Sequence, residues 1–143
     1  MKRTRIIGTV FLCATAGLVG AADFDGSEPM LCSTVAVNEC LPNGDCERVT
    51  ANSINAPNFL RVDVDEKTIT NADADATRPA NVIESSAVMS GKLYLQGKDD
   101  GLEGVRDDGL AWSVSINQVT GEMVLTASGS EVAFVIFGAC IAI

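Results

Sequence analysis

The stretch Leu60-Arg61-Val62-Asp63-Val64-Asp65 alternates apolar and charged residues, and this alternation decides the fold class. Successive side chains of a β-strand point to opposite faces, so the pattern predicts a half-buried strand. Leu60, Val62 and Val64 are expected to face a core, and the charged residues between them to face water. One such strand needs partners, and the neighbouring segments supply them.

The same alternation returns over residues 112–117, where Trp112, Val114 and Ile116 are expected to face inward. Ser90-Gly91 separates two further strand-like runs, 82–89 and 93–96, and predicts a tight hairpin. The run 132–137 is apolar on both faces, which favours a central or covered strand. About seven strands joined by short turns predict a mainly β fold, an antiparallel meander forming a small barrel or a curled sheet.

The segment after residue 22 gives a mixed signal. Ser27 followed by Glu28 and Pro29 is typical of a helix start, and predicts a short N-terminal helix from Glu28 to about Asn38. The run Thr34-Val35-Ala36-Val37 is rich in β-branched residues and favours a strand instead.

Residues 1–21 are typical of a secretory signal peptide, leaving a single domain over residues 22–143. Lys2, Arg3 and Arg5 precede an apolar stretch, Ile6 to Val19, that is too short to span a bilayer comfortably. We therefore expect export to the periplasm, or secretion, and no membrane span after cleavage. Without those three of its ten basic residues, the mature chain has seven against 19 acidic, a net charge of −12.

Cleavage would also remove Cys13 and leave four cysteines, an even number that predicts two disulfides in an oxidising compartment. Four cysteines allow three pairings. The turn-rich segment Leu41 to Asp45 favours Cys40–Cys46, which leaves Cys32–Cys140 to tie the start of the domain to its last strand.

Composition excludes several classes of function. The chain has no histidine, which excludes Ser-His-Asp sites and imidazole-ligated metals. Its net charge of −9 argues against nucleic-acid binding. The sequence gives no reason to expect a cofactor.

Acidic residues give one candidate metal site. Lys98-Asp99-Asp100-Gly101-Leu102 recurs as Arg106-Asp107-Asp108-Gly109-Leu110, and we interpret the repeat as a duplicated loop insertion. Asp99, Asp100, Asp107 and Asp108 are weak candidates for calcium ligands, since hard cations prefer carboxylate oxygens. A solvated acidic loop needs no metal.

The outer face offers one candidate contact residue, Tyr94, which lies between Leu93 and Leu95. Trp112 has the inward register and is expected to pack in the core.

Several short motifs together resemble a family of small exported proteobacterial proteins that have no assigned activity. The matching residues are Asp25-Gly26-Ser27, Pro29-x-Leu31-Cys32, Glu39-Cys40, Cys46, Pro57-x-Phe59-Leu60-Arg61-Val62-Asp63, Trp112-Ser113-x-x-Ile116, Thr120-Gly121-x-Met123 and the C-terminal Phe137-Gly138-Ala139-Cys140. The resemblance implies a periplasmic location and a shared cysteine framework, and it implies no catalytic residues.

Taken together, these patterns predict a non-enzymatic periplasmic β-domain that binds a small ligand or a protein partner. The acidic charge favours a basic partner. One alternative is a lysozyme inhibitor-like protein, because lysozymes are basic. A second alternative is a minor envelope hydrolase that uses carboxylates.

Overall fold

Antiparallel strands form nearly all of the regular structure in the computed structural model, which describes residues 24–73, 77–101 and 109–143. One turn of 3₁₀ helix, η1 (Asn52–Ile54), connects two of the strands. The strands are β1 (Met30–Cys40), β2 (Cys46–Val49), β3 (Phe59–Asp63), β4 (Thr68–Asn71), β5 (Asn81–Met89), β6 (Lys92–Asp99), β7 (Leu110–Asn117), β8 (Glu122–Ser128) and β9 (Ala133–Ala142).

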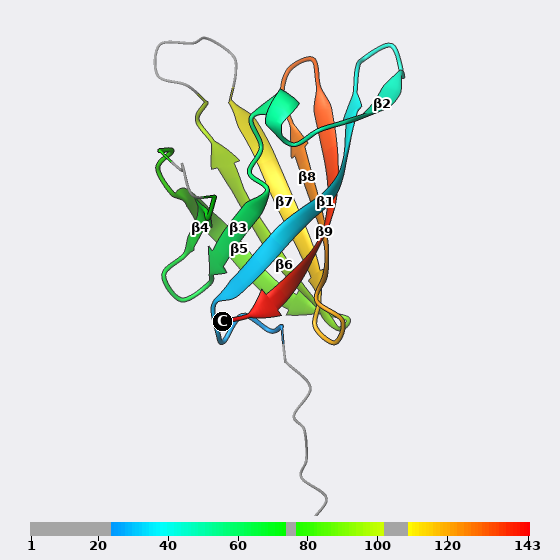
Figure 1. Cartoon of the computed structure of the whole chain (residues 1–143). Coiled ribbons are helices and arrows are strands. Elements are labelled where there is room, and N and C mark those ends of the chain that lie inside the picture. Colours follow the sequence, from blue (N-terminus) through cyan, green and yellow to red (C-terminus); the bar gives the residue numbers. More distant parts are fainter. Residues whose placement is uncertain (1–23, 74–76, 102–108) are drawn as a thin grey trace, which may run out of the picture.

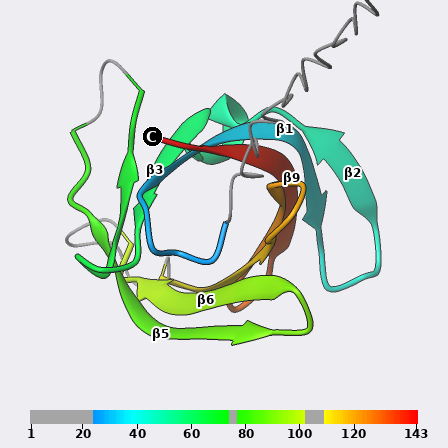
Figure 2. The same cartoon turned by 90° about the horizontal axis from the view of Figure 1, so that it is seen from below.

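The sheet closes into a barrel because β1 pairs with β9 along its whole length, from Met30↔Ala142 to Cys40↔Ala133. The other barrel strands, β3 to β9, follow one another in sequence order around the ring. Figure 2 shows the ring viewed along the barrel from below. Eight strands therefore form the barrel and β2 is an extra one, which refines the expected count of about seven.

β1 changes neighbours halfway along its length. Its first residues pair with β3 and its last with β2, so the β1–β2 hairpin extends beyond the barrel wall (Figure 1). A register shift between Thr34 and Ala36 marks the change, and Val35 at this point is 65% exposed. The side-chain hydroxyl of Thr34 donates a hydrogen bond of 2.9 Å to the carbonyl oxygen of Pro57.

The helix expected from Glu28 to about Asn38 is wrong, because β1 occupies most of that range. The β-branched run is the stronger signal: it pairs with β9, and Val37 also pairs with Val49 of β2 on the other edge. Local capping residues cannot compete with a ladder of that length. The extended Thr34 to Val37 segment also brings Val37 into the core, where it is 2% exposed.

The alternation predicted for the other strands is confirmed. Leu60 and Val62 of β3 are buried, as are Trp112, Val114 and Ile116 of β7. The hairpin between β5 and β6 turns at Ser90 and Gly91, whose φ angles of 52° and 73° are the pair that a tight two-residue turn requires. β9 is central, between β8 and β1, but its outer face is open to solvent, with Phe137 44% exposed.

The barrel interior is filled mainly by inward side chains. The larger cluster of buried residues is Phe24, Met30, Cys32, Leu60, Val62, Ile69, Ile83, Leu93, Leu95, Trp112, Val114, Ile116, Met123, Ala127 and Cys140. A smaller cluster of Val37, Ala51 and Ile136 lies with the segment that carries η1.

Phe24 closes the lower end of the barrel. The segment that follows it crosses beneath the ring in Figure 2, and the Phe24 side chain is 6% exposed. Gly121 makes room for it: a Cβ there would lie 2.8 Å from the Phe24 ring. The backbone N–H of Phe24 also donates to the carbonyl oxygen of Gln118 at 3.2 Å.

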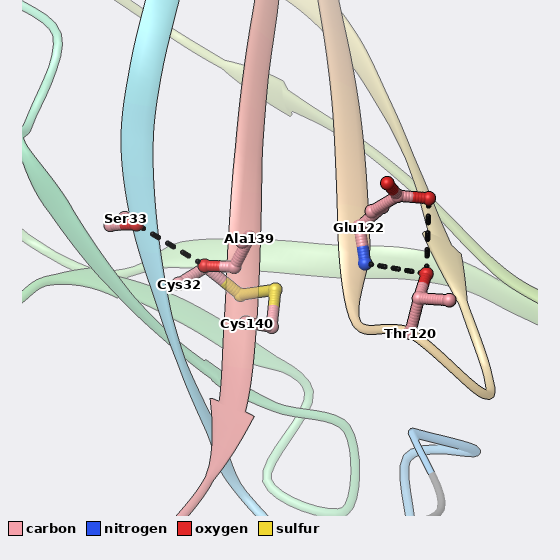
Figure 3. The surroundings of a disulfide bond; sticks show 6 residues. All are labelled: Cys32, Ser33, Thr120, Glu122, Ala139 and Cys140. Atoms are coloured by element: carbon pink, nitrogen blue, oxygen red, sulfur yellow. Dashed lines mark hydrogen bonds between the residues drawn. A yellow bond between two sulfur atoms is a disulfide. The ribbon is translucent and has the colours of Figure 1, made fainter.

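Both disulfides have the pairing favoured by the sequence. Cys32–Cys140 joins the two strands that close the barrel, and both residues are buried (Figure 3). Cys40–Cys46 closes the loop at the turn end of the β1–β2 hairpin, where Cys46 is exposed.

One seam of the barrel is short. β4 and β5 share only two residue pairs, Thr68↔Val82 and Ile69↔Asn81. Most of β5 beyond this point, from Glu84 to Met89, is exposed.

The expected signal peptide, residues 1–21, lies outside the described residues. Within the described part of the chain, no helix is long and apolar enough to cross a membrane.

Candidate functional site

The two ends of the barrel differ. Phe24 fills the lower end, whereas the upper end in Figure 1, where η1 lies, is hollow. Two hollows occupy this end, and both are lined by Ile54, Asn55, Arg78, Asp99 and Leu110. We call these five residues the mouth.

The outer hollow, the vestibule, is open to solvent and has a volume of about 570 Å³. Beyond the mouth, its described lining comes from the β8–β9 connection and the start of β9. These lining residues are Gly101, Gly129, Ser130, Glu131, Val132 and Phe134.

The deeper hollow, the inner cavity, has a volume of about 130 Å³ and lies at the top of the barrel core. Its described lining beyond the mouth is mainly apolar, with a few hydroxyl and amide groups. These residues are Thr34, Ala56, Pro57, Leu60, Ile69, Asn71, Pro79, Asn81, Trp112, Leu125, Ala127 and Ile136.

Trp112 is the one large aromatic residue in the described lining of the inner cavity, and its neighbours make space for it. On β7 it pairs with Gly97 of β6 on one side and Ala127 of β8 on the other. A Cβ at Gly97 would overlap the Trp112 ring, so the indole lies in the space that a side chain at Gly97 would fill. The ring therefore packs against the β6 backbone at Gly97.

The indole nitrogen of Trp112 is chemically unusual. The residue is 8% exposed, and Nε1 is buried with no hydrogen-bond partner among the described residues. An indole N–H is a donor only, and a buried donor without an acceptor costs about 1–3 kcal/mol. The expectation that Trp112 packs in the core is confirmed.

Charged groups stand at the mouth. The Arg78 guanidinium lies 3.9 Å from the Asp99 carboxylate, and Asp99 also accepts a 2.9 Å hydrogen bond from the backbone N–H of Gly101. Glu131 adds a second carboxylate at the vestibule. The described lining thus carries one positive and two negative side chains, of which Arg78 and Asp99 line both hollows and Glu131 lines the vestibule alone.

Two of the four calcium candidates are engaged by cations. Asp99 lies beside Arg78, and Asp100 forms an ion pair with Lys98 in which the charged atoms are 3.0 Å apart. The hydrogen bond and charge of Asp100 raise the pKa of Lys98. Asp107 and Asp108 lie outside the described residues. Within the described ranges, no three His, Cys, Asp or Glu side chains form a group that could hold a metal ion.

Tyr94, the candidate contact residue, lies far from this chemistry. It is half-buried on the outer face of β6, opposite Ala87 and Ser115, and lines neither hollow. Its role in contacts stays a prediction.

The sequence reasoning did not identify the mouth. Ile54 and Asn55 come from η1 and the residue after it, Arg78 from the β4–β5 connection, and Asp99 and Leu110 from facing ends of β6 and β7. No local pattern links four separate segments. The one usable signal was Gly97, a glycine within a strand, which often marks a site where another group approaches closely.

Comparison of the chain with protein-family models, with curated proteins and with solved structures finds no match. The family resemblance described above therefore stays a prediction.

Proposed function

We propose that this protein is a non-enzymatic binding protein that holds a small, mainly apolar ligand at the upper end of its barrel. One observation carries the proposal: the vestibule shares the five residues of the mouth with an inner cavity whose described lining is mainly apolar and includes Trp112. Binding sites are commonly concave and mainly apolar, with a few polar groups that fix orientation.

The dimensions support a small ligand. Eight-stranded barrels are just wide enough to be filled by side chains or to hold one small molecule. Here the lower part of the barrel is filled and the upper part is not. An apolar cavity of about 150 Å³ accepts one benzene ring in another protein, so the inner cavity of about 130 Å³ suits a ring of similar size. The rest of the ligand would lie in the vestibule.

The two disulfides support a location outside the cytoplasm. Structural disulfides such as these two are found mainly in oxidising compartments. Together with the signal-like residues 1–21, they support the proposal that the protein acts in the periplasm or after secretion.

A fluorescent probe tests ligand binding directly. The neutral dye N-phenyl-1-naphthylamine brightens in apolar surroundings, and we expect the protein to increase its emission saturably at one site. Ala127→Leu should weaken this binding at least about 10-fold, because the added side chain fills the cavity beside Trp112.

Ala87→Leu is the matched control, since Ala87 lies on the outer face of β5 and is exposed. It should bind the dye as the unchanged protein does, and circular dichroism should show that both variants are folded. The proposal fails if the unchanged protein does not bind the dye saturably, or if Ala127→Leu binds it equally well.

A further inference from the structure

We propose that two copies of this chain associate by antiparallel pairing along one edge of β5, over residues 84–89. We call this stretch the open edge. None of its residues is in the described lining of either hollow, so self-association and ligand binding are separate properties of the chain.

The open edge begins where the seam between β4 and β5 stops. On one side β5 pairs with β6 as far as Met89, whereas on the other side it pairs with β4 at only two positions. A hydrogen bond of 2.9 Å from the N–H of Ile83 to the carbonyl oxygen of Lys67 is the last across the seam within the described residues. Beyond it no described strand lies beside β5, which runs along the bottom of Figure 2. Every side chain of the open edge is exposed, with Val88 at 55% and Met89 at 61%.

The backbone of the open edge faces outward at Ser86 and Val88. Residues of an antiparallel ladder alternate between bonding one neighbouring strand and facing the other side. Met89 pairs with Lys92 across the two-residue turn, so Met89 and then Ala87 bond β6. The N–H and C=O groups of Ser86 and Val88 therefore point away from β6, where no described backbone group pairs with them. A row of such groups is a template for another strand.

The described sheet has a second free edge, that of β2, and the sequence protects it. β2 is four residues long and carries Glu47 and Arg48. Short edge strands and charged side chains keep further strands from adding. The open edge is longer, contains no lysine or proline, and carries a single charged residue, Glu84. The contrast indicates that the open edge is covered by another strand in solution.

A second copy of the chain suits the open edge because the residue order is self-complementary. A two-fold axis at Ser86 places each Ser86 opposite the same residue of the other copy, and each Glu84 opposite Val88 of the other copy. The two Ser86 backbones then exchange two hydrogen bonds, and no like charges face each other directly. The same contact occurs once from each side, so the dimer is closed and both open edges are covered.

Sedimentation velocity measures this association directly, with the purified protein at about 10 μM to about 1 mM. We expect a dissociation constant on the order of 100 μM, because one pair of strands buries less surface than a stable dimer needs. Raising NaCl from about 50 mM to about 500 mM should tighten the dimer, since salt screens the repulsion between two acidic copies. The Ser86 amide should exchange its hydrogen about 5-fold more slowly at the highest protein concentration than at the lowest.

Two variants at the centre of the open edge test the geometry. Ser86→Pro removes the N–H that faces outward and leaves the bonds to β6 in place, so it should raise the dissociation constant at least about 10-fold. Ser86→Lys places two like charges opposite each other and should raise it at least about threefold. Ser128→Lys is the matched control, because it adds the same charge to an exposed position of β8, a strand that is paired on both edges. It should dimerise at least as tightly as the unchanged protein.

Circular dichroism should show that each variant is folded, and Ser86→Lys decides the matter if Ser86→Pro is not. A protein that stays monomeric at about 1 mM at both salt concentrations overturns the proposal. So does a dimer that Ser86→Lys forms as tightly as Ser128→Lys, or one in which exchange of the Ser86 amide does not slow, because its interface would lie elsewhere.

Discussion

Replacing the cysteines of the two disulfides in pairs should destabilise the barrel by different amounts. Cys32 and Cys140 are 108 residues apart in sequence, whereas Cys40 and Cys46 are six apart. In the chain-entropy treatment of cross-links, a disulfide restricts the unfolded chain more strongly when it closes a longer loop. These separations give about 5 kcal/mol for the long loop and about 2 kcal/mol for the short one.

The surroundings of the two bonds strengthen the contrast. Cys32 and Cys140 are 0% and 4% exposed, so replacing both with alanine also removes buried sulfur from the core. Cys40–Cys46 ties only the projecting hairpin, and Cys46 is exposed. The difference between the two variants should therefore be at least about 2.5 kcal/mol.

Guanidinium chloride unfolding, followed by the fluorescence of Trp112, measures both free energies. The double variant C40A/C46A is the matched control for C32A/C140A, because each lacks one bond and two sulfurs. A C32A/C140A chain that is unfolded without denaturant, beside a folded C40A/C46A chain, agrees with the reasoning. Equal losses, or a larger loss in C40A/C46A, would refute it.

Three further predictions concern the lower end of the barrel and its turns. Phe24→Ala should lower the free energy of unfolding, measured with denaturant, by about 3 kcal/mol. Phe59→Ala removes an exposed ring and should lower it by less than about 1 kcal/mol. Similar losses of stability in the two variants would mean that Phe24 does not close the barrel. Gly121→Ala should lower the unfolding free energy by about 3 kcal/mol, because φ is +70° and the new Cβ would lie 2.5 Å from a backbone carbonyl oxygen of β9. Gly44→Ala, with φ of +92° in open space, should cost only about 1 kcal/mol, and thermal melts of the two variants would check the difference. Hydrogen bonds from Ser27 lower the pKa of Asp25 below its ordinary 3.8. The stabilising effect of the Asp25 carboxylate is therefore present above pH 3.8 and is lost as the pH falls through the lower pKa of the folded protein. The stability of Asp25→Asn should fall less on acidification than that of the unchanged protein, and parallel profiles of stability against pH would contradict this.

Alternation and turn chemistry made much of the barrel predictable from the sequence. The strand around Val62, the β7 strand with Trp112 and the Ser90-Gly91 hairpin each follow from a local rule. The disulfide pairing also followed from a turn-rich segment between two cysteines. These features depend on neighbours in sequence, so one chain is enough to predict them.

Other features depend on contacts between distant segments. For β1 the sequence carries conflicting signals, a helix start at Ser27 to Pro29 and a β-branched run at Thr34 to Val37, and the pairing with the distant β9 decides for the strand. Phe24 gave no sign that it would close an end of the barrel. The mouth joins residues from four segments, and the unpartnered state of Trp112 Nε1 depends on every side chain around it.

The pairing of β1 with β9 also governs when the protein can fold. The described chain supplies one of these strands near its start and the other at its end, so a partly synthesised chain can form hairpins but cannot close the ring. Pairings between such distant segments are slow to form. Until they form, the growing sheet has two open edges to which strands of another chain can add. Pairing of β1 with β9 thus closes the ring and removes both of these edges in one step.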